Sequence, residues 1–502
     1  MKINTGSKNF RIILFSVIGL AVLAAVILIL TLTSPDSGET GTEEETTTTT
    51  TIDPALMLQP EDKGDIESIY IENGNGSFTV RPVTNGDGDK IWIVEGMEDI
   101  DEGLWVQSSL ENISKTLTGM TARSVIEEKP EDLEQYGLVN PQAKATVRYS
   151  GGESFTLLIG GNVVSGSASY VKTGDSDTVY SYYTYNLSSI VNNDPMSFIN
   201  TAAMPSYDSS TAPEIKKITV KRKDLDAPII LEALPEVPED SIQVYAYAFT
   251  SPYDVYLDLT EGNTYLNAMF SLTADKAAYV NPTDEQRAET GLDDPFCEVD
   301  MLAGDTIYRL YIGNSVTEEV TDEETGVTTT ELRGFYAMSN QVKDVIYYFS
   351  ADKLVWATME PTRYMSKLFL MPYIYDLDTV TYRDENCEFT AVVEGNADEG
   401  KVILNGNDSD IDRFKTFYQF LVSCRGEEIY TDEEKGDFIA EFSYTYDDSR
   451  EPDTVVLYGS DDRTVIIEVN GKNIFKTKWN YGTRLKENAQ AYLNGEEVIL
   501  NY

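Results

Sequence analysis

The sequence GLVNPQAKATVRYSGGESFTLLIG occupies Gly137–Gly160, and the chain repeats it twice in altered form. The second copy, GLDDPFCEVDMLAGDTIYRLYIG, occupies Gly291–Gly313, and the more divergent third copy, GDFIAEFSYTYDDSREPDTVVLYG, occupies Gly436–Gly459. The first and last glycines of the copies are therefore 23, 22 and 23 residues apart. Because repeats of nearly constant spacing mark a structural unit that is used several times, we predict tandem modules.

A short acidic segment precedes the first glycine of each copy, at Glu131–Tyr136, Asp284–Thr290 and Asp432–Lys435. Glycine ends helices readily because it adopts left-handed backbone angles without a steric penalty. We therefore predict a short helix before each copy, and we assign the repeated glycines to helix termination rather than to chemistry.

Alternating apolar and polar residues predict short strands upstream of each copy. These strands are Ser68–Glu72, Ser77–Val83 and Lys90–Glu95, then Lys217–Arg222, Pro228–Ala233 and Gln243–Phe249, then Thr379–Arg383, Phe389–Glu394 and Lys401–Asn405. Apolar residues at helical spacing follow the strands and predict one helix in each module. They are Val106, Leu110, Ile113, Leu117 and Met120, then Leu266, Met269 and Leu272, then Ile411, Phe414, Phe417 and Leu421.

The predicted fold class is α+β, with three tandem copies of a mostly antiparallel sheet-plus-helix module at 64–200, 213–360 and 374–502. Thr201–Ala212 and Thr362–Tyr373 are predicted joints between these domains. The acidic insert Glu318–Glu331 lengthens one hairpin of the second module, and we expect it to project as an exposed loop.

Ile12–Leu32 is an uncharged run of 21 residues, of which fifteen are Leu, Ile, Val or Phe. Such a run is long enough to cross the hydrocarbon core of a bilayer as a helix. Basic residues precede it and acidic residues follow it, so the positive-inside rule leaves residues 1–11 in the cytoplasm. The alternative is a cleaved signal peptide, but its apolar core would be shorter, about 7–15 residues. Residues 33–63, rich in Thr and Glu, are predicted to be a disordered linker.

The chain has 38 basic and 85 acidic residues, a formal net charge of −47 and no histidine. This charge disfavours nucleic acid and anionic lipid as partners. The absence of histidine excludes a Ser-His-Asp triad, a Cys-His pair and a His-ligated zinc site. Three cysteines, Cys297, Cys387 and Cys424, are too few for a disulfide framework. Free thiols are the main expectation, and a single Cys387–Cys424 bond is the alternative.

Two stretches have part of the spacing of a calcium-binding loop, Asn85-x-Asp87-x-Asp89 and Asp408-x-Asp410-x-Asp412. Each lacks the glycine required at the sixth position, where Lys90 and Arg413 stand, and the glutamate required at the twelfth. We therefore interpret both as solvated turns. No phosphate-binding loop occurs. The sequence yields no catalytic, cofactor-binding or metal site, and no cofactor.

Aromatic residues cluster at Tyr180–Tyr185, Tyr245–Phe249 and Tyr347–Phe349. Their alternation is typical of half-buried strands, and it leaves open a sugar- or peptide-binding face that would include Tyr182 and Tyr247. A carboxylate-based hydrolase is a further alternative, but 85 acidic residues make proximity in sequence uninformative.

The first copy resembles the bacterial domain of unknown function 4340 (DUF 4340) family, and the resemblance covers about 65–360. The motifs that carry it are Asp132–Leu138, Asn140-Pro141, Phe155–Gly160, Tyr170-Val171 and Val179-Tyr180, repeated as Thr290–Leu292, Asp294-Pro295, Tyr308–Gly313, Phe335-Tyr336 and Val345–Tyr347. The third copy departs from the pattern, because it lacks the Leu and Pro that follow the glycine.

The resemblance implies a single-anchor envelope protein, because members of the family are typically of this kind. It also implies an accessory role, because members are often encoded beside ABC-type transporters related to gliding-motility export systems. We therefore expect a non-enzymatic accessory subunit with its C-terminal bulk outside the bacterial cell membrane and an ABC-type permease or other envelope proteins as partners. The alternative is a cell-surface module that binds envelope polysaccharide or peptide.

Overall fold

The computed structural model describes residues 53–59, 63–164, 166–208, 210–235, 245–322, 325–360, 362–397, 399–430, 433–447, 450–460 and 463–502. The chain divides into two units, Met1–Pro54 and Ala55–Tyr502, and the described sheets all belong to the second. The predicted membrane-spanning run 12–32 and most of the predicted linker 33–63 lie outside the described residues. Within the described ranges, no helix has both the length and the apolar character needed to cross a membrane.

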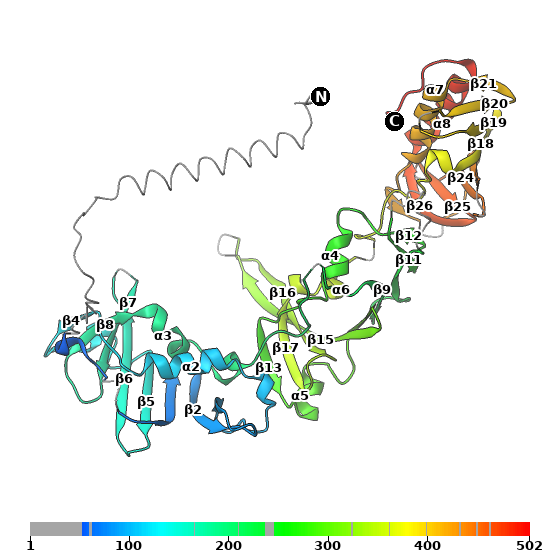
Figure 1. The fold of residues 1–502 in the computed structure, drawn as a ribbon. Coiled ribbons are helices and arrows are strands. Elements are labelled where there is room, and N and C mark those ends of the chain that lie inside the picture. Colours follow the sequence, from blue (N-terminus) through cyan, green and yellow to red (C-terminus); the bar gives the residue numbers. More distant parts are fainter. Residues whose placement is uncertain are drawn as a thin grey trace, which may run out of the picture. The chain divides into compact units, whose positions relative to one another are not determined.

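Three antiparallel sheets follow one another along the chain (Figure 1). The first has the strand order β3-β2-β1-β5-β6-β7-β8-β4 and contains β1 (Ile66–Asn73), β2 (Gly76–Thr84), β3 (Lys90–Val94), β4 (Ser124–Glu127), β5 (Ala143–Tyr149), β6 (Ser154–Asn162), β7 (Ala168–Thr173) and β8 (Val179–Tyr183). Its helices are α2 (Gln107–Thr116), α3 (Thr184–Val191) and the 3-10 turns η1 (Pro54–Leu56), η2 (Glu102–Leu104), η3 (Glu134–Tyr136) and η4 (Pro195–Phe198).

The second sheet has the order β12-β11-β10-β9-β14-β15-β16-β17-β13. Its strands are β9 (Ile215–Arg222), β10 (Ile229–Ala233), β11 (Tyr247–Ser251), β12 (Val255–Tyr256), β13 (Lys276–Val280), β14 (Cys297–Ala303), β15 (Thr306–Thr321), β16 (Thr328–Ser339) and β17 (Val345–Ser350). Its helices are α4 (Gly262–Asn267), α5 (Asp284–Glu289), η5 (Ala351–Lys353) and α6 (Val355–Thr358).

The third sheet has the order β21-β20-β19-β18-β23-β24-β25-β26-β22. Its strands are β18 (Leu377–Asp384), β19 (Glu388–Glu394), β20 (Lys401–Leu404), β21 (Asn407–Ser409), β22 (Glu428–Ile429), β23 (Phe438–Tyr446), β24 (Asp453–Gly459), β25 (Thr464–Val469) and β26 (Lys472–Lys478). Its helices are η6 (Ile374–Asp376), α7 (Ile411–Val422) and α8 (Trp479–Asn494).

The three sheets share one topology, which confirms the prediction of three α+β modules. An N-terminal meander joins a second meander through the central pairs β1–β5, β9–β14 and β18–β23. A short strand from the connection between the meanders, β4, β13 or β22, returns to pair with the last strand of the sheet. The third module therefore has the same fold as the others although its sequence copy is the most divergent.

Helices cover one face of each sheet, and the strands alternate accordingly. On β5, Ala143, Ala145, Val147 and Tyr149 are buried and the residues between them are more exposed. Such alternation is expected of an antiparallel sheet with one face against the core and one toward solvent. The apolar spacings predicted α2 and α7, and their faces are buried as expected, including Leu110, Ile113, Phe414 and Phe417. In the second module α4 ends at Asn267, earlier than the spacing suggested.

Two of the three predicted helix-stop glycines are confirmed. Gly137 ends η3 with φ 64°, and Gly291 follows α5 with φ 70°. The prediction is wrong for Gly436, because Glu433–Lys435 is not helical and Gly436 has no positive φ. There the Gly436 N–H donates to the Gly459 carbonyl at 2.9 Å, so the backbone is held by the sheet instead of by a helix end.

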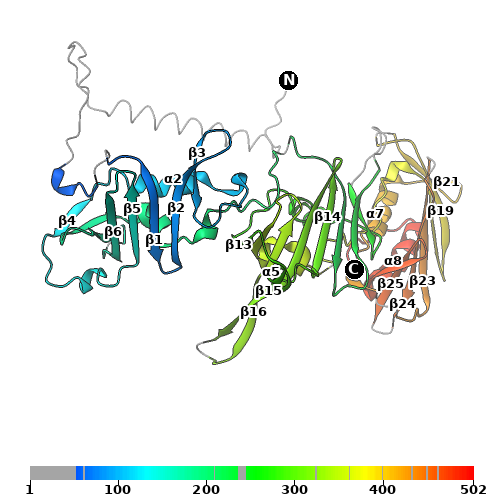
Figure 2. The ribbon, with the colours of Figure 1, turned by 90° about the horizontal axis from the view of Figure 1, so that it is seen from below.

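The acidic insert of the second module extends a hairpin, but most of it forms strand rather than loop (Figure 2). Strands β15 and β16 continue past the sheet to Thr321 and Thr328, and their outer residues are exposed. The insert is rich in threonine and valine, which favour extended backbone. Arg333 bonds Glu318 across the strands at 2.7 Å, which helps to hold the register.

Candidate functional site

The two calcium-like motifs are used for local backbone structure. Asn85 Oδ1 accepts the backbone N–H groups of Asp87 at 3.1 Å and Asp89 at 2.8 Å, which closes a turn. Asp410 is the N-cap of α7 and accepts from the backbone of Asp412 and Arg413. Across the described ranges, no group of three His, Cys, Asp or Glu side chains is placed to hold a metal ion.

The aromatic clusters lie largely inside the modules. Tyr182 and Tyr245 are only 8% and 6% exposed, and Tyr347 and Phe349 are fully buried. Burial raises the pKa of Tyr182 and of Tyr247 above the ordinary tyrosine value. Only the end of the first cluster is open: Tyr183 is 52% exposed, under the Arg123 guanidinium at 5.4 Å, and Tyr185 is 87% exposed.

All three cysteines are free thiols, so the alternative Cys387–Cys424 bond is not formed in the structure. Cys297 and Cys424 are buried, and Cys387 donates to Asp384 Oδ2 at 3.7 Å. Burial, reinforced by Asp384, raises the pKa of Cys387 to about 11, and burial raises that of Cys297 to about 12. A raised thiol pKa lowers the thiolate fraction at neutral pH, which makes these cysteines poor nucleophiles.

Thiol titration checks this account. Denatured chain without reductant should react with a disulfide reagent at three thiols. The native chain should react slowly at pH 7, and the rate at Cys387 should rise about tenfold per pH unit, because only the thiolate attacks. Recovery of one thiol from the denatured chain, with Cys297 identified as the labelled residue by peptide mapping, would instead establish a Cys387–Cys424 bond.

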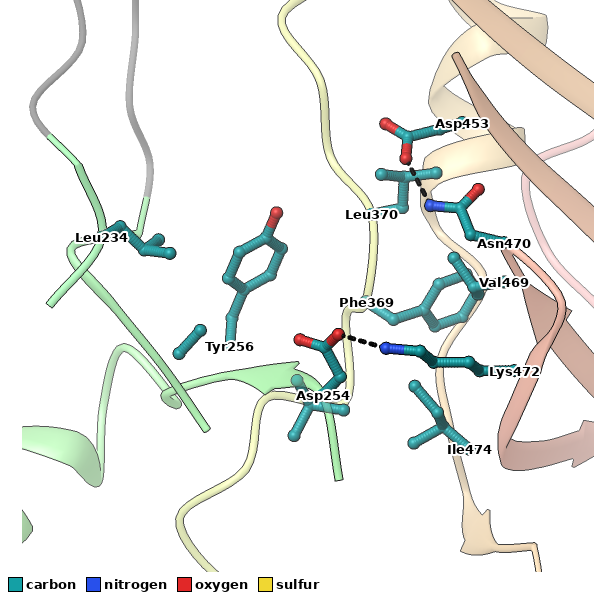
Figure 3. Close-up of a pocket in the computed structure, with 12 residues that line it drawn as sticks. Leu234, Asp254, Tyr256, Phe369, Leu370, Asp453, Val469, Asn470, Lys472 and Ile474 are labelled. Atoms are coloured by element: carbon teal, nitrogen blue, oxygen red, sulfur yellow. Dashed lines mark hydrogen bonds and ion pairs between the residues drawn. The ribbon is translucent and has the colours of Figure 1, made fainter. Parts of the chain in front are cut away.

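A cavity of about 290 Å³ is lined by residues of the second and third modules and of the segment that joins them (Figure 3). Tyr256, Phe369 and Ile474 supply apolar surface. Lys472 pairs with Asp254 at 2.8 Å, and Asn470 donates to Asp453 at 2.7 Å. Because these polar groups already satisfy one another, the cavity offers few free contacts to a ligand.

The third module carries a second depression, the α8 hollow, of about 430 Å³ between the start of β23 and helix α8. Its walls include Glu385, Asp437, Phe438, Trp479, Lys486 and Glu487. Phe438 is 39% exposed and Trp479 is 46% exposed, whereas Trp92, Trp105 and Trp356 are between 0% and 7% exposed. A half-exposed Trp beside a hollow is typical of a binding surface.

This surface could not be predicted from the sequence, because Phe438 and Trp479 are 41 positions apart and lie on different elements, β23 and α8. One signal was available for α8: Tyr481, Leu485, Ala489 and Tyr492 stand at helical spacing, and all four are buried. That spacing places Trp479 at the exposed first position of the helix.

The sequence model of a family described as Domain of unknown function (DUF4340) matches residues 106–232. Residues 106–232 are therefore similar to proteins of the DUF4340 family. No curated protein and no solved structure matches the chain. The DUF4340 match begins one residue before α2 and ends in β10, so it joins the latter part of the first module to the first strands of the second.

Proposed function

We propose that the chain is a non-enzymatic, membrane-anchored extracytoplasmic protein, an accessory subunit of an ABC-type, gliding-motility-like transport or surface-assembly system. The repetition of one sheet-and-helix module three times carries this proposal, because tandem modules present several surfaces to a partner. The apolar run Ile12–Leu32 supports the anchor. The resemblance to the DUF4340 family, whose members are often encoded beside ABC-type transporters, supports the partner class. The absence of histidine excludes a Ser-His-Asp triad and a Cys-His pair, and no other catalytic motif was found in the sequence.

In-cell crosslinking of the full-length protein, followed by purification and mass spectrometry, tests the proposal. We expect an ABC-type permease or its ATPase among the crosslinked proteins. The matched control keeps residues 33–502 and replaces 12–32 by an unrelated single-pass anchor. Partners held by the modules should survive this exchange, and partners held by the native anchor should be lost. Recovery of no membrane protein with either protein would contradict the accessory role.

The second candidate is a cell-surface module for envelope polysaccharide or peptide, and the exposed aromatic side chains favour it. Tyr182 is buried, so the informative variants are Tyr183→Ala and Tyr185→Ala, whose side chains are accessible. Recovery of wall material alone in the crosslinking experiment, reduced by these two substitutions, would favour this candidate over the first.

A further inference from the structure

The third module differs from the other two at the glycine that ends each sequence copy, which is Gly160, Gly313 or Gly459. In the first module a methyl group built on Gly160 would lie 3.0 Å from Leu138 Cγ, and in the second the equivalent distance from Gly313 to Leu292 Cγ is 3.1 Å. In the third module Asp437 replaces this leucine. The atom nearest to a methyl group on Gly459 is Trp479 Cζ3, at 3.4 Å. The Trp479 ring thus takes the place of the missing leucine.

This exchange changes a buried contact into an open surface. Leu138 and Leu292 are 4% and 9% exposed, whereas Asp437 is exposed and Trp479 is half exposed. Gly482 lies in the wall of the α8 hollow, and a methyl group there would come within 3.3 Å of Ile439 and Val465. The absence of a side chain at Gly482 therefore lets α8 lie close to the sheet beside the hollow.

Among the described residues, most charged side chains of the α8 hollow are ion-paired, but Asp437 is not. Lys486 pairs with Glu385 at 2.9 Å, and Glu487 pairs with Arg484 at 2.6 Å. Asp437 makes no ion pair and no side-chain hydrogen bond with any residue that the structure describes. Because Glu385 and Glu487 are each offset by a basic partner, the net negative charge of the wall comes from Asp437.

The two aromatic rings of the hollow, Phe438 and Trp479, also differ in whether a cation lies over them. The Arg383 guanidinium lies 5.4 Å from the centre of the Phe438 ring and bonds Glu441 at 2.7 Å. No cation of the described chain lies over Trp479, although an indole ring attracts cations more strongly than a phenyl ring. The hollow therefore combines a half-exposed indole ring with a carboxylate that has no ion-pair partner among the described residues.

We infer that the α8 hollow binds a lysine or arginine side chain of a partner protein. The cation would lie against the Trp479 ring with its charge toward Asp437, and its aliphatic stem would cover the apolar wall. An anionic ligand would meet net negative charge, and a neutral sugar would leave the Asp437 charge uncompensated. The inference deepens the proposed function, because it states the chemistry by which the third module recognises a partner.

Binding of fluorescein-labelled heptalysine to the full-length protein in detergent, followed by anisotropy at about 150 mM salt, tests the inference. Asp437→Asn should weaken binding about fivefold, the effect of one nearby charge. Trp479→Ala should weaken it about threefold or more. The control is Asp305→Asn, which removes the same charge from an exposed side chain of the second module that pairs with Lys216 at 3.4 Å, and it should change affinity less than about twofold. Heptalysine, but not heptaglutamine, should also alter the Trp emission of the unsubstituted protein.

Equal weakening by Asp437→Asn and Asp305→Asn would overturn the inference, because the peptide would then sense only the overall charge. Equal binding of heptaglutamine, or a Trp response to a neutral oligosaccharide in place of heptalysine, would also overturn it. A protein that binds heptalysine through Asp437 but crosslinks to no membrane protein would support the inference and reject the accessory-subunit role. The two proposals therefore fail separately.

Discussion

Replacing Phe417 by Ala is expected to lower the free energy of unfolding of the third module by about 3–5 kcal/mol. Phe417 is fully buried on α7, and its ring lies 5.5 Å from that of Phe389, 5.2 Å from that of Tyr492 and 6.1 Å from that of Tyr382. Removal of the ring loses burial of apolar area and leaves a cavity where four aromatic side chains meet, and a close-packed core collapses only partly around such a gap.

Hydrogen exchange with mass spectrometry at increasing urea concentration measures this effect, because peptides from β18–β26 report on the third module alone. Unfolding of three modules is not one two-state transition, so the midpoint must be read for each module separately. The matched control is Gln419→Ala on the exposed side of the same helix, where a change within about 0.5 kcal/mol is expected. Equal midpoints for the two variants would contradict the assignment of Phe417 to the core.

Gly160→Ala is expected to destabilise the first module by about 3 kcal/mol or more, at the upper end of overpacking effects. The added methyl carbon would lie 2.2 Å from the Tyr136 carbonyl oxygen, and this backbone atom cannot move without displacing η3. Gly313→Ala should act in the same way on the second module, because its methyl group would lie 2.1 Å from the Thr290 carbonyl oxygen.

The third copy supplies the control for this prediction. Gly459→Ala places its methyl group 3.4 Å from the Trp479 ring, an ordinary contact distance, and should be tolerated. Gly86→Ala in a turn of the first module meets nothing within 4 Å and should also be close to neutral. The same urea series measures all four variants. If Gly459→Ala proved as damaging as Gly160→Ala, the structural difference at the third copy would be refuted.

Features with a regular period could be predicted from the sequence. The repeated glycines revealed three modules, and apolar spacing located α2 and α7. The edge strands β4, β13 and β22 were not predicted, because they are between two and five residues long and are defined by pairing with strands far along the chain. Local sequence carries little information about such pairing.

The third copy led to one error for an identifiable reason. The acidic residues before Gly436 match those before Gly137 and Gly291, but the Leu that packs on the second glycine is absent. Without that packing, Gly436 bonds to Gly459 across the sheet, and the helix does not form. The same exchange produced the α8 hollow, whose parts come from the turn after β18, the start of β23 and α8 and could not be assembled from sequence spacing.

The offset between the DUF4340 match and the sheets has a practical consequence for protein production. A fragment cut at residues 106 and 232 would keep β5 but remove its neighbour β1, and would keep β9 but remove its neighbour β14. Both surviving strands would then present unpaired backbone groups, which promote aggregation. Cloning boundaries set at the limits of a complete sheet, such as 63–200 for the first, would keep every strand with its partners.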